Sequence, residues 1–130
     1  MVMMNDYKLI KELAGYTKIQ RWDLLKELGR EAADHLRLVM HKAVQQCSHL
    51  IVATHVPPLR DACWHEGTLS DDEWSPHFTC LSVGEALLEV ASQYPNHQIT
   101  VLCGHTHSPG ESRLLSRINS RGAPESNRAV

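Results

Sequence analysis

The sequence lacks the charge pattern and the cysteine pairs that mark several common classes of protein. Its 130 residues carry a formal net charge of −2, and lysine and arginine are scattered along the chain. No basic stripe is present that could follow a phosphate backbone, so we expect no nucleic acid as a binding partner. The four cysteines include no C-x-x-C pair, which indicates neither a zinc ribbon nor a disulfide framework. We therefore predict reduced cysteines that serve in packing.

The amino end does not match the pattern expected of a targeting or membrane-spanning segment. It reads "MVMMNDYKLI", with no basic flank, and reaches Asp6 after only four apolar residues. Signal peptides and membrane helices both need longer apolar stretches, so we predict a cytoplasmic protein with no membrane partner. A chain of this length suits one modest domain, which we assign to residues 1–121. Residues 122–130 are rich in small and polar residues and are predicted to be a disordered tail.

Two segments show the apolar spacing of amphipathic helices. The first runs from Leu24 to Cys47, with apolar residues at steps of three or four. The second begins at Ser82, where S-V-G-E matches a capping box that uses Glu85, and is ended by Pro95.

Two continuous apolar runs have the length of strands. They are "LIVAT" at residues 50–54 and "ITVLC" at residues 99–103. Such runs are typical of a sheet that helices cover on both faces. Strands joined by a helical crossover are normally parallel neighbours or near neighbours, so their carboxyl ends should share one edge. The predicted fold class is α/β, with helices packed on a short sheet that contains parallel strands.

Histidines follow both predicted strands at this shared edge. His55 ends the first, just before two prolines turn the chain away, and "GHTH" carries His105 and His107 after the second. Gly104 is expected to let the backbone turn tightly or approach a ligand. Neutral imidazole is the commonest metal ligand in proteins. We therefore predict that His55, His105 and His107 bind a divalent transition metal.

The alternative for any histidine is a loop residue with an ordinary hydrogen bond. We assign that role to four others: His35, His41, His49 and His97. Between Val56 and about Cys80 the sequence shows little periodicity, and a stretch of that length inside a compact domain is usually functional. The candidates for contact with substrate in this segment are Trp64, His65 and Trp74. A packed surface loop would also contain such residues, so this alternative stays open.

The segments "VATHVPP" and "VLCGHTH" together resemble two signatures of the calcineurin-like metallophosphoesterases, in the order that this family has them. The resemblance covers roughly residues 45–108 and implies part of a four-layer α-β-β-α sandwich, its carboxyl-terminal half. It also implies that His55 and His105 bind one ion of a dinuclear centre and His107 the other, with manganese, iron or zinc as the metal. The implied reaction is hydrolysis of phosphomonoesters or phosphodiesters by a metal-activated water.

Three motifs of that family are absent: D-x-H, G-D-x-x-D and G-N-H, which supply a bridging aspartate and a histidine that assists the leaving group. The pair Asn96-His97 follows a proline and lies late in the chain, so we do not assign it the latter role. Without these motifs the isolated chain is expected to be inactive or feeble as an enzyme.

Three hypotheses remain open for the function. The first is a phosphoesterase that needs an amino-terminal half or a partner chain to complete it. The second is a non-catalytic metal-binding or protein-interaction module derived from such an enzyme. The third is a mononuclear hydrolase that uses the three histidines alone. Because few elements remain to cover the apolar strands, we also expect a partner or a homo-oligomer.

Overall fold

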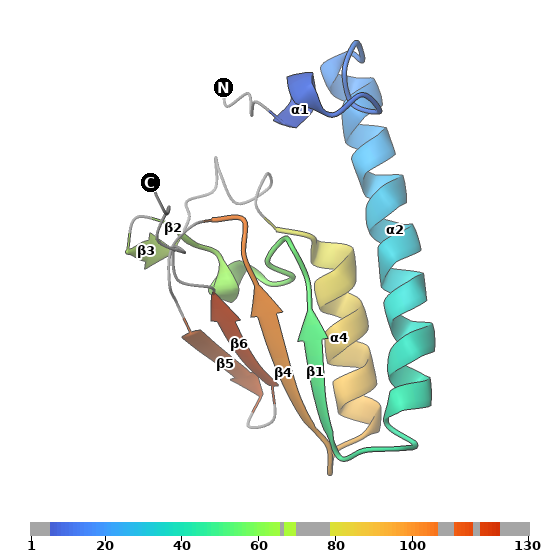
Figure 1. The fold of residues 1–130 in the computed structure, drawn as a ribbon, viewed down its shortest axis with the longest axis vertical. Helices are drawn as coiled ribbons and strands as arrows, with labels where there is room; N and C mark the ends of the chain where they lie inside the picture. The colour runs from blue at the N-terminus through green and yellow to red at the C-terminus, as the bar shows by residue number, and fades with distance from the viewer. Residues whose placement is uncertain (1–5, 66, 70–78, 107–110, 116–117, 123–130) are drawn as a thin grey trace, which may run out of the picture.

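The computed structural model describes residues 6–65, 67–69, 79–106, 111–115 and 118–122, and its fold is of the α/β class (Figure 1). The helices are α1 (Asp6–Leu9), α2 (Lys18–Ala43), the 3-10 helix η1 (Arg60–Ala62) and α4 (Leu81–Gln93). The strands are β1 (His49–Ala53), β2 (Trp64–His65), β3 (Thr68–Leu69), β4 (Gln98–Cys103), β5 (Glu111–Leu115) and β6 (Ile118–Gly122).

The main sheet has the strand order β1-β4-β6-β5. Strands β1, β4 and β6 are parallel, and β5 is antiparallel to β6. The register pairs Leu50 with Ile99 and Val52 with Val101, and α4 forms the crossover between β1 and β4. The predicted pair of parallel neighbours is therefore confirmed.

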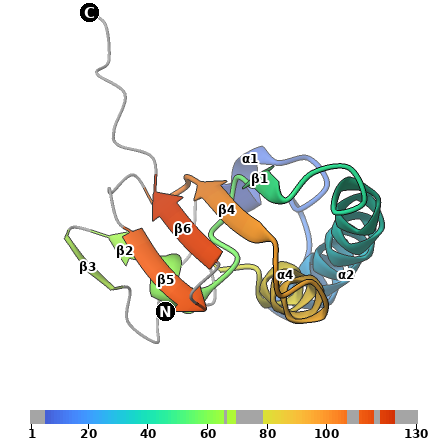
Figure 2. The same cartoon turned by 90° about the horizontal axis from the view of Figure 1, so that it is seen from below.

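Both long helices lie on the same face of this sheet (Figure 2). The alternate side chains of β1 and β4 that face the helices are buried: Leu50, Val52, Ile99, Val101 and Cys103. On the opposite face Ile51 is 69% exposed and Leu102 is 44% exposed. The prediction that helices cover both faces is therefore wrong for the part of the chain that the structure describes. The physical reason is that α2 and α4 pack against each other and share one hydrophobic core with β1 and β4, so both helices occupy the same side of the sheet.

Helix α2 begins with a capping box that sequence analysis did not identify. The Thr17 hydroxyl accepts a hydrogen bond from the Gln20 N–H at 3.3 Å, and the Gln20 side-chain oxygen accepts one from the Thr17 N–H at 3.0 Å. The helix covers most of the predicted segment, and its fully buried positions are Ala33 and Met40. Leu28 belongs to the predicted apolar stripe but is 46% exposed.

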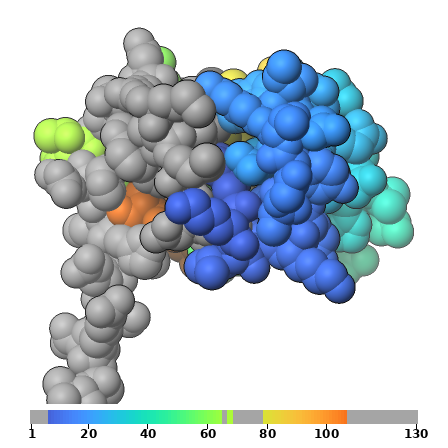
Figure 3. Space-filling view, turned by 90° about the horizontal axis from the view of Figure 1, so that it is seen from above, coloured from blue at the N-terminus to red at the C-terminus, as the bar shows by residue number. Residues whose placement is uncertain are grey.

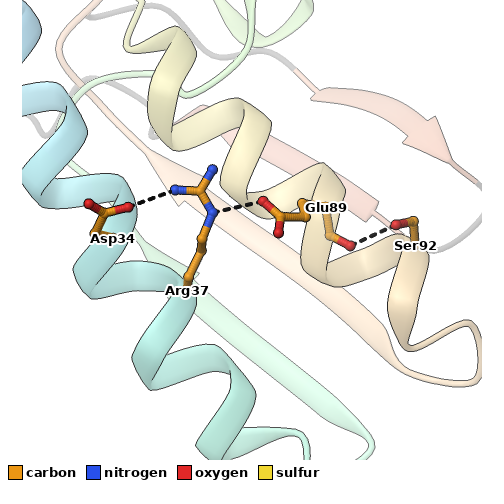
Figure 4. A network of polar contacts seen from close by, with 4 residues as sticks. All are labelled: Asp34, Arg37, Glu89 and Ser92. Atoms are coloured by element: carbon orange, nitrogen blue, oxygen red, sulfur yellow. Dashed lines mark hydrogen bonds and ion pairs between the residues drawn. The ribbon is translucent and has the colours of Figure 1, made fainter.

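An ion-pair network on the surface links α2 to α4 (Figure 4). Arg37 donates from Nε to Glu89 at 2.7 Å and from Nη1 to Asp34 at 3.0 Å. The Ser92 hydroxyl donates to the Glu89 backbone carbonyl at 2.7 Å. The hydrogen bond with Glu89 is the main cause that raises the pKa of the Arg37 guanidinium, so Arg37 is charged at any physiological pH.

The predicted capping box at the start of α4 is wrong. The N-cap is Cys80, which makes no side-chain capping bond, and Ser82 already lies inside the first turn. A tertiary contact fixes this start, because the Cys80 N–H donates to the Pro57 carbonyl at 3.0 Å. Gly84 packs directly on the Pro58 carbonyl, where a Cβ atom would overlap the backbone. The first turn of α4 is thus pressed against the segment that follows β1.

The segment from Val56 to Cys80 contains more regular structure than predicted. It includes η1 and a short antiparallel pair in which β2 meets β3. Beyond His107 the β5–β6 hairpin extends the sheet, a feature that the sequence analysis did not predict. The predicted disordered tail lies, except for Gly122, outside the described residues.

The four cysteines are free thiols, and Cys63 and Cys103 are buried, as expected for packing residues, whereas Cys47 is exposed. Among the helices that the structure describes, none has the length and apolar character needed to cross a membrane.

Candidate metal centre

Backbone hydrogen bonds tie together the two segments that follow β1 and β4. The Thr54 N–H donates to the Leu102 carbonyl at 2.9 Å, and the Gly104 N–H donates to the His55 carbonyl at 3.0 Å. These bonds continue the contact between the strands beyond Ala53 and Cys103. Both strands point toward the same edge of the sheet (Figure 1). These backbone hydrogen bonds therefore fix the two segments relative to each other without the help of side chains.

His55 and His105 meet at this edge. The His55 Nε2 and His105 Nδ1 atoms are 3.2 Å apart, and the rings lie edge to face with centroids separated by 5.1 Å. The His55 side chain is exposed and His105 is partly buried. In a view onto this end of the molecule, the segment that ends β4 reaches the surface (orange in Figure 3). The pair is accessible from solvent.

The backbone of His105 adopts the left-handed conformation, with φ of 71°. It is the only residue other than glycine with positive φ in the described part of the chain. Such a conformation costs roughly 1–3 kcal/mol and persists only where the surroundings enforce it. The next residue, Thr106, is 4% exposed, and its N–H donates to the Gly104 carbonyl at 2.9 Å. A buried anchor and a tight turn thus hold His105 in place.

Gly104 does not make the tight turn that was predicted as one of its two possible roles, and its predicted close approach to a ligand stays a prediction. Its φ is not positive, and a Cβ atom there would come no closer than 3.8 Å to the His55 carbonyl oxygen. The tight turn is made instead by the following residue, His105. Histidine is among the residue types that enter the left-handed region more often than most, so the turn could form without a glycine.

The distance between the two ring nitrogens fits a shared metal ion. Two nitrogen ligands each about 2.0–2.1 Å from a tetrahedral zinc ion lie about 3.3–3.4 Å from each other. The observed separation of 3.2 Å is close to this value. The same separation also fits a hydrogen bond between two neutral imidazoles, in which one nitrogen carries the proton.

The third predicted ligand, His107, lies outside the described residues. Among the residues that the structure does describe, no group of three His, Cys, Asp or Glu side chains is placed to hold a metal. The structure therefore brings together two of the three predicted ligands.

Two of the three predicted substrate-binding residues lie in the described part of the chain, in the short strand β2. Trp64 and His65 form β2, which pairs with β3, and η1 next to it contacts β5 and β6 (Figure 1). The Trp64 indole N–H is buried and has no hydrogen-bond partner in the described part of the chain. Trp74 lies outside the described residues. Nothing in this arrangement places β2 next to His55 and His105.

Three of the histidines that were assigned ordinary roles have hydrogen-bond partners elsewhere. His41 Nδ1 is 3.2 Å from the Tyr94 hydroxyl, and His49 Nε2 is 3.0 Å from the Thr100 hydroxyl. His97 Nε2 donates to the Val44 carbonyl at 3.0 Å, whereas its buried Nδ1 has no partner among the described residues. His35 is exposed on α2.

Sequence reasoning missed the contacts that position the histidine pair. The buried Thr106 and the backbone bonds of Thr54 and Gly104 carry no motif that would reveal them. Comparison of the chain with protein-family models, with curated proteins and with solved structures finds no match in any of the three.

Proposed function

We propose that this chain is the metal-binding, carboxyl-terminal part of a cytoplasmic metal-dependent phosphoesterase. The observation that supports the proposal is the pair His55 Nε2 and His105 Nδ1, 3.2 Å apart at the carboxyl edge of two parallel strands. Ligands of open α/β sheets bind at this edge. The helices on one face of one sheet would form half of a four-layer α-β-β-α sandwich, and the reaction would be hydrolysis of a phosphomonoester or phosphodiester.

Each part of the proposed site follows from the residues that the chain provides. His55 and His105 would hold one divalent ion of manganese, iron or zinc, and His107 is the proposed further ligand. A divalent ion, when bound, polarises the phosphoryl group and lowers the pKa of water at the site. Histidine ligands are neutral, so a site made of them alone stays strongly positive. It suits an anionic phosphoester but holds a second cation poorly.

The same reasoning predicts little catalysis by the isolated chain. The bridging carboxylate and the leaving-group acid of the family's route have no counterpart in the motifs of this sequence. General acid–base assistance alone is worth about 10²–10⁴ in rate. We therefore propose that another chain or segment, such as an amino-terminal half, supplies these groups.

Calorimetric titration with zinc and manganese tests the metal site. We expect the full chain to bind about one ion, and His55→Ala or His105→Ala to weaken binding by at least about tenfold. His35→Ala is the matched control, because His35 is an exposed histidine on α2 outside the site. Equal affinity in the wild type, both site variants and the control would refute the metal site.

Hydrolysis of p-nitrophenyl phosphate with manganese tests the chemistry. We expect the isolated chain to work at or near the background rate, and activity to appear when an amino-terminal half is added. That activity should require His55. Strong metal-dependent turnover by the chain alone, abolished by His107→Ala, would show instead that a mononuclear site is sufficient.

The exposed side chains of Ile51 and Leu102, on the sheet face opposite the helices, favour a second candidate function, a metal-binding interaction module. Exposed apolar surface often marks a contact with another protein. Retained metal binding without activity in the presence of the amino-terminal half would favour this candidate over the enzyme.

A further inference from the structure

The turn that carries His55 is poor in backbone hydrogen-bond donors. His55 is followed by Val56 and then by Pro57 and Pro58, and neither proline has an N–H group. Two successive positions therefore cannot donate the backbone hydrogen bonds that usually close a turn. Val56 favours an extended conformation, because it precedes a proline. Another donor is needed to hold the chain where it bends away from β1.

The Thr54 side chain provides that donor. Its hydroxyl donates to the Val56 carbonyl at 3.0 Å, so this hydrogen bond spans His55 from one side to the other. The backbone N–H of Thr54 donates to the Leu102 carbonyl at 2.9 Å. Threonine commonly makes such local bonds between its side chain and the backbone. Thr54 is thus tied to β4 by its backbone and closes the turn by its side chain.

The His55 ring depends on the backbone for its direction. Its side chain is exposed, and its ring has one hydrogen-bond partner in the part of the chain that the structure describes, His105 Nδ1 at 3.2 Å. The His55 carbonyl accepts the Gly104 N–H at 3.0 Å, which fixes the peptide that follows the ring. The bond from Thr54 to Val56 fixes the residues on both sides of it. A change in this turn would therefore move the His55 ring away from His105.

Packing alone gives no reason for a hydroxyl at residue 54. Leu50 and Val52 precede it on the side of β1 that faces the helices, and both are buried and apolar. Valine has nearly the same shape as threonine and is at least as favourable in a strand. Burying a hydroxyl is costly unless it is hydrogen-bonded, and the bond to Val56 is its only one among the described residues. The function of this hydroxyl is thus connected with the turn.

We propose that Thr54 is a positioning residue of the candidate metal centre, whose hydroxyl closes the turn and so holds the His55 ring beside His105. The proposal deepens the proposed function, and its consequence for metal affinity rests on that function. Removal of a group that orients a metal ligand commonly weakens metal binding by about 10–100-fold. Thr54 acts on His55 through the backbone, so we expect the lower end of this range.

Zinc titration of three variants tests the proposal. Thr54→Val removes the hydroxyl but keeps the shape of the side chain, and it should weaken zinc binding by about tenfold. Thr54→Ser keeps the hydroxyl and should restore the affinity of the wild type. Thr100→Val is the matched control, because Thr100 is half-buried on β4 and its hydroxyl also makes one side-chain hydrogen bond, at 3.0 Å to His49 Nε2. It should leave zinc affinity unchanged.

Nuclear Overhauser effects between the rings of His55 and His105 give a second measurement, which needs no metal. The two rings lie edge to face with centroids 5.1 Å apart, so their protons are close enough for such an effect. In metal-free buffer we expect the effect in the wild type, Thr54→Ser and Thr100→Val, and its loss in Thr54→Val. Circular dichroism checks that each variant is folded. If Thr54→Val is not, Thr54→Ala removes the hydroxyl without placing a methyl group in its position and is measured instead.

The two measurements separate this proposal from the proposed function. An unchanged ring contact and unchanged zinc affinity in Thr54→Val would overturn the positioning role. Equal losses in Thr54→Ser would overturn it in favour of the methyl group, and equal losses in Thr100→Val in favour of the sheet as a whole. A wild type without the ring contact would also overturn it. A ring contact that requires the hydroxyl in a wild type that binds no zinc would support the role of Thr54 and refute the metal site.

Discussion

Replacement of Gly84 by alanine would force apart two segments that are in direct backbone contact. A Cβ atom at Gly84 would lie 3.1 Å from the Pro58 carbonyl carbon, 2.8 Å from Leu59 Cδ2 and closer still to the Pro58 carbonyl oxygen. Pro58 cannot move freely, because it is fully buried and the preceding Pro57 carbonyl accepts the Cys80 N–H. The helix or the loop must therefore shift by about 1 Å.

The size of the effect follows from two opposing terms. Overpacking a buried contact typically costs about 1–3 kcal/mol, and sometimes more where backbone atoms are involved. Alanine is favoured over glycine inside a helix by up to about 1 kcal/mol, which offsets part of that cost. We expect Gly84→Ala to lower the free energy of unfolding by about 1–3 kcal/mol. The shifted loop carries His55, so the same variant should also bind metal more weakly.

Gly29→Ala provides the control. Gly29 lies in α2, and a Cβ atom there would come no closer than 3.4 Å to the Cys80 sulfur and 3.7 Å to the Ser82 hydroxyl, which are ordinary contacts. It should gain helix propensity without a clash and be as stable as the wild type or up to about 1 kcal/mol more stable. Urea unfolding followed by circular dichroism measures both variants. A Gly84→Ala protein as stable as the wild type, or equal losses in both variants, would refute the reasoning.

Three further predictions concern helix capping, backbone strain and the surface ion pair. Thr17→Ala should lower the free energy of unfolding by about 1 kcal/mol, because it removes the capping box of α2; no change in thermal unfolding would contradict this role. His105→Gly should be more stable than His105→Ala by about 1 kcal/mol in metal-free buffer, because only glycine adopts a φ of 71° without strain; equal urea midpoints would rule out strain at this position. Arg37→Ala should lower stability in dilute buffer but not in 1 M NaCl, where exposed charges are screened. Because the pKa of Arg37 is raised in the folded protein, its stabilising effect is complete below the pKa of the unfolded state and is lost only as the pH rises through the pKa of the folded state. The difference in stability between the wild type and Arg37→Ala should therefore stay constant between about pH 6 and 9.

The order of elements around the site could be predicted because local patterns determine it. The apolar runs that contain Leu50 and Ile99 are strands, and the crossover between them is helical. The contact between His55 and His105 follows from this order, because the two parallel strands end at the same edge of the sheet. The exposure of Ile51 could not be predicted in this way. An apolar residue looks the same in sequence whether a second layer covers it or not, and the number of covering layers is a property of the whole assembly.

The start of α4 and the β5–β6 hairpin show a second limit. "SVGE" matches a capping box, but the contact of Cys80 with Pro57 sets the first turn, and no local pattern contains that contact. The segment of β5 and β6 is rich in serine and arginine and lacks the apolar alternation of a strand. Pairing of β6 with β4 adds backbone hydrogen bonds at a sheet edge, and those bonds do not depend on side-chain type.

The backbone strain at His105 makes it possible to test whether this residue serves to stabilise the fold or to bind a ligand through its imidazole ring. If the imidazole only stabilised the loop by its contact with His55, then His105→Gly should lower the free energy of unfolding, even though glycine removes the backbone strain. If the ring serves to bind a ligand, His105→Gly should keep or raise stability while metal affinity falls, since functional sites often retain strained residues that the fold alone would not favour. Gly104, one residue earlier, shows that the chain already has a residue suited to the left-handed conformation, yet the turn uses the histidine. Its ring is thereby held 3.2 Å from His55 Nε2. A variant that becomes both less stable and no weaker in metal affinity would assign His105 to the fold instead.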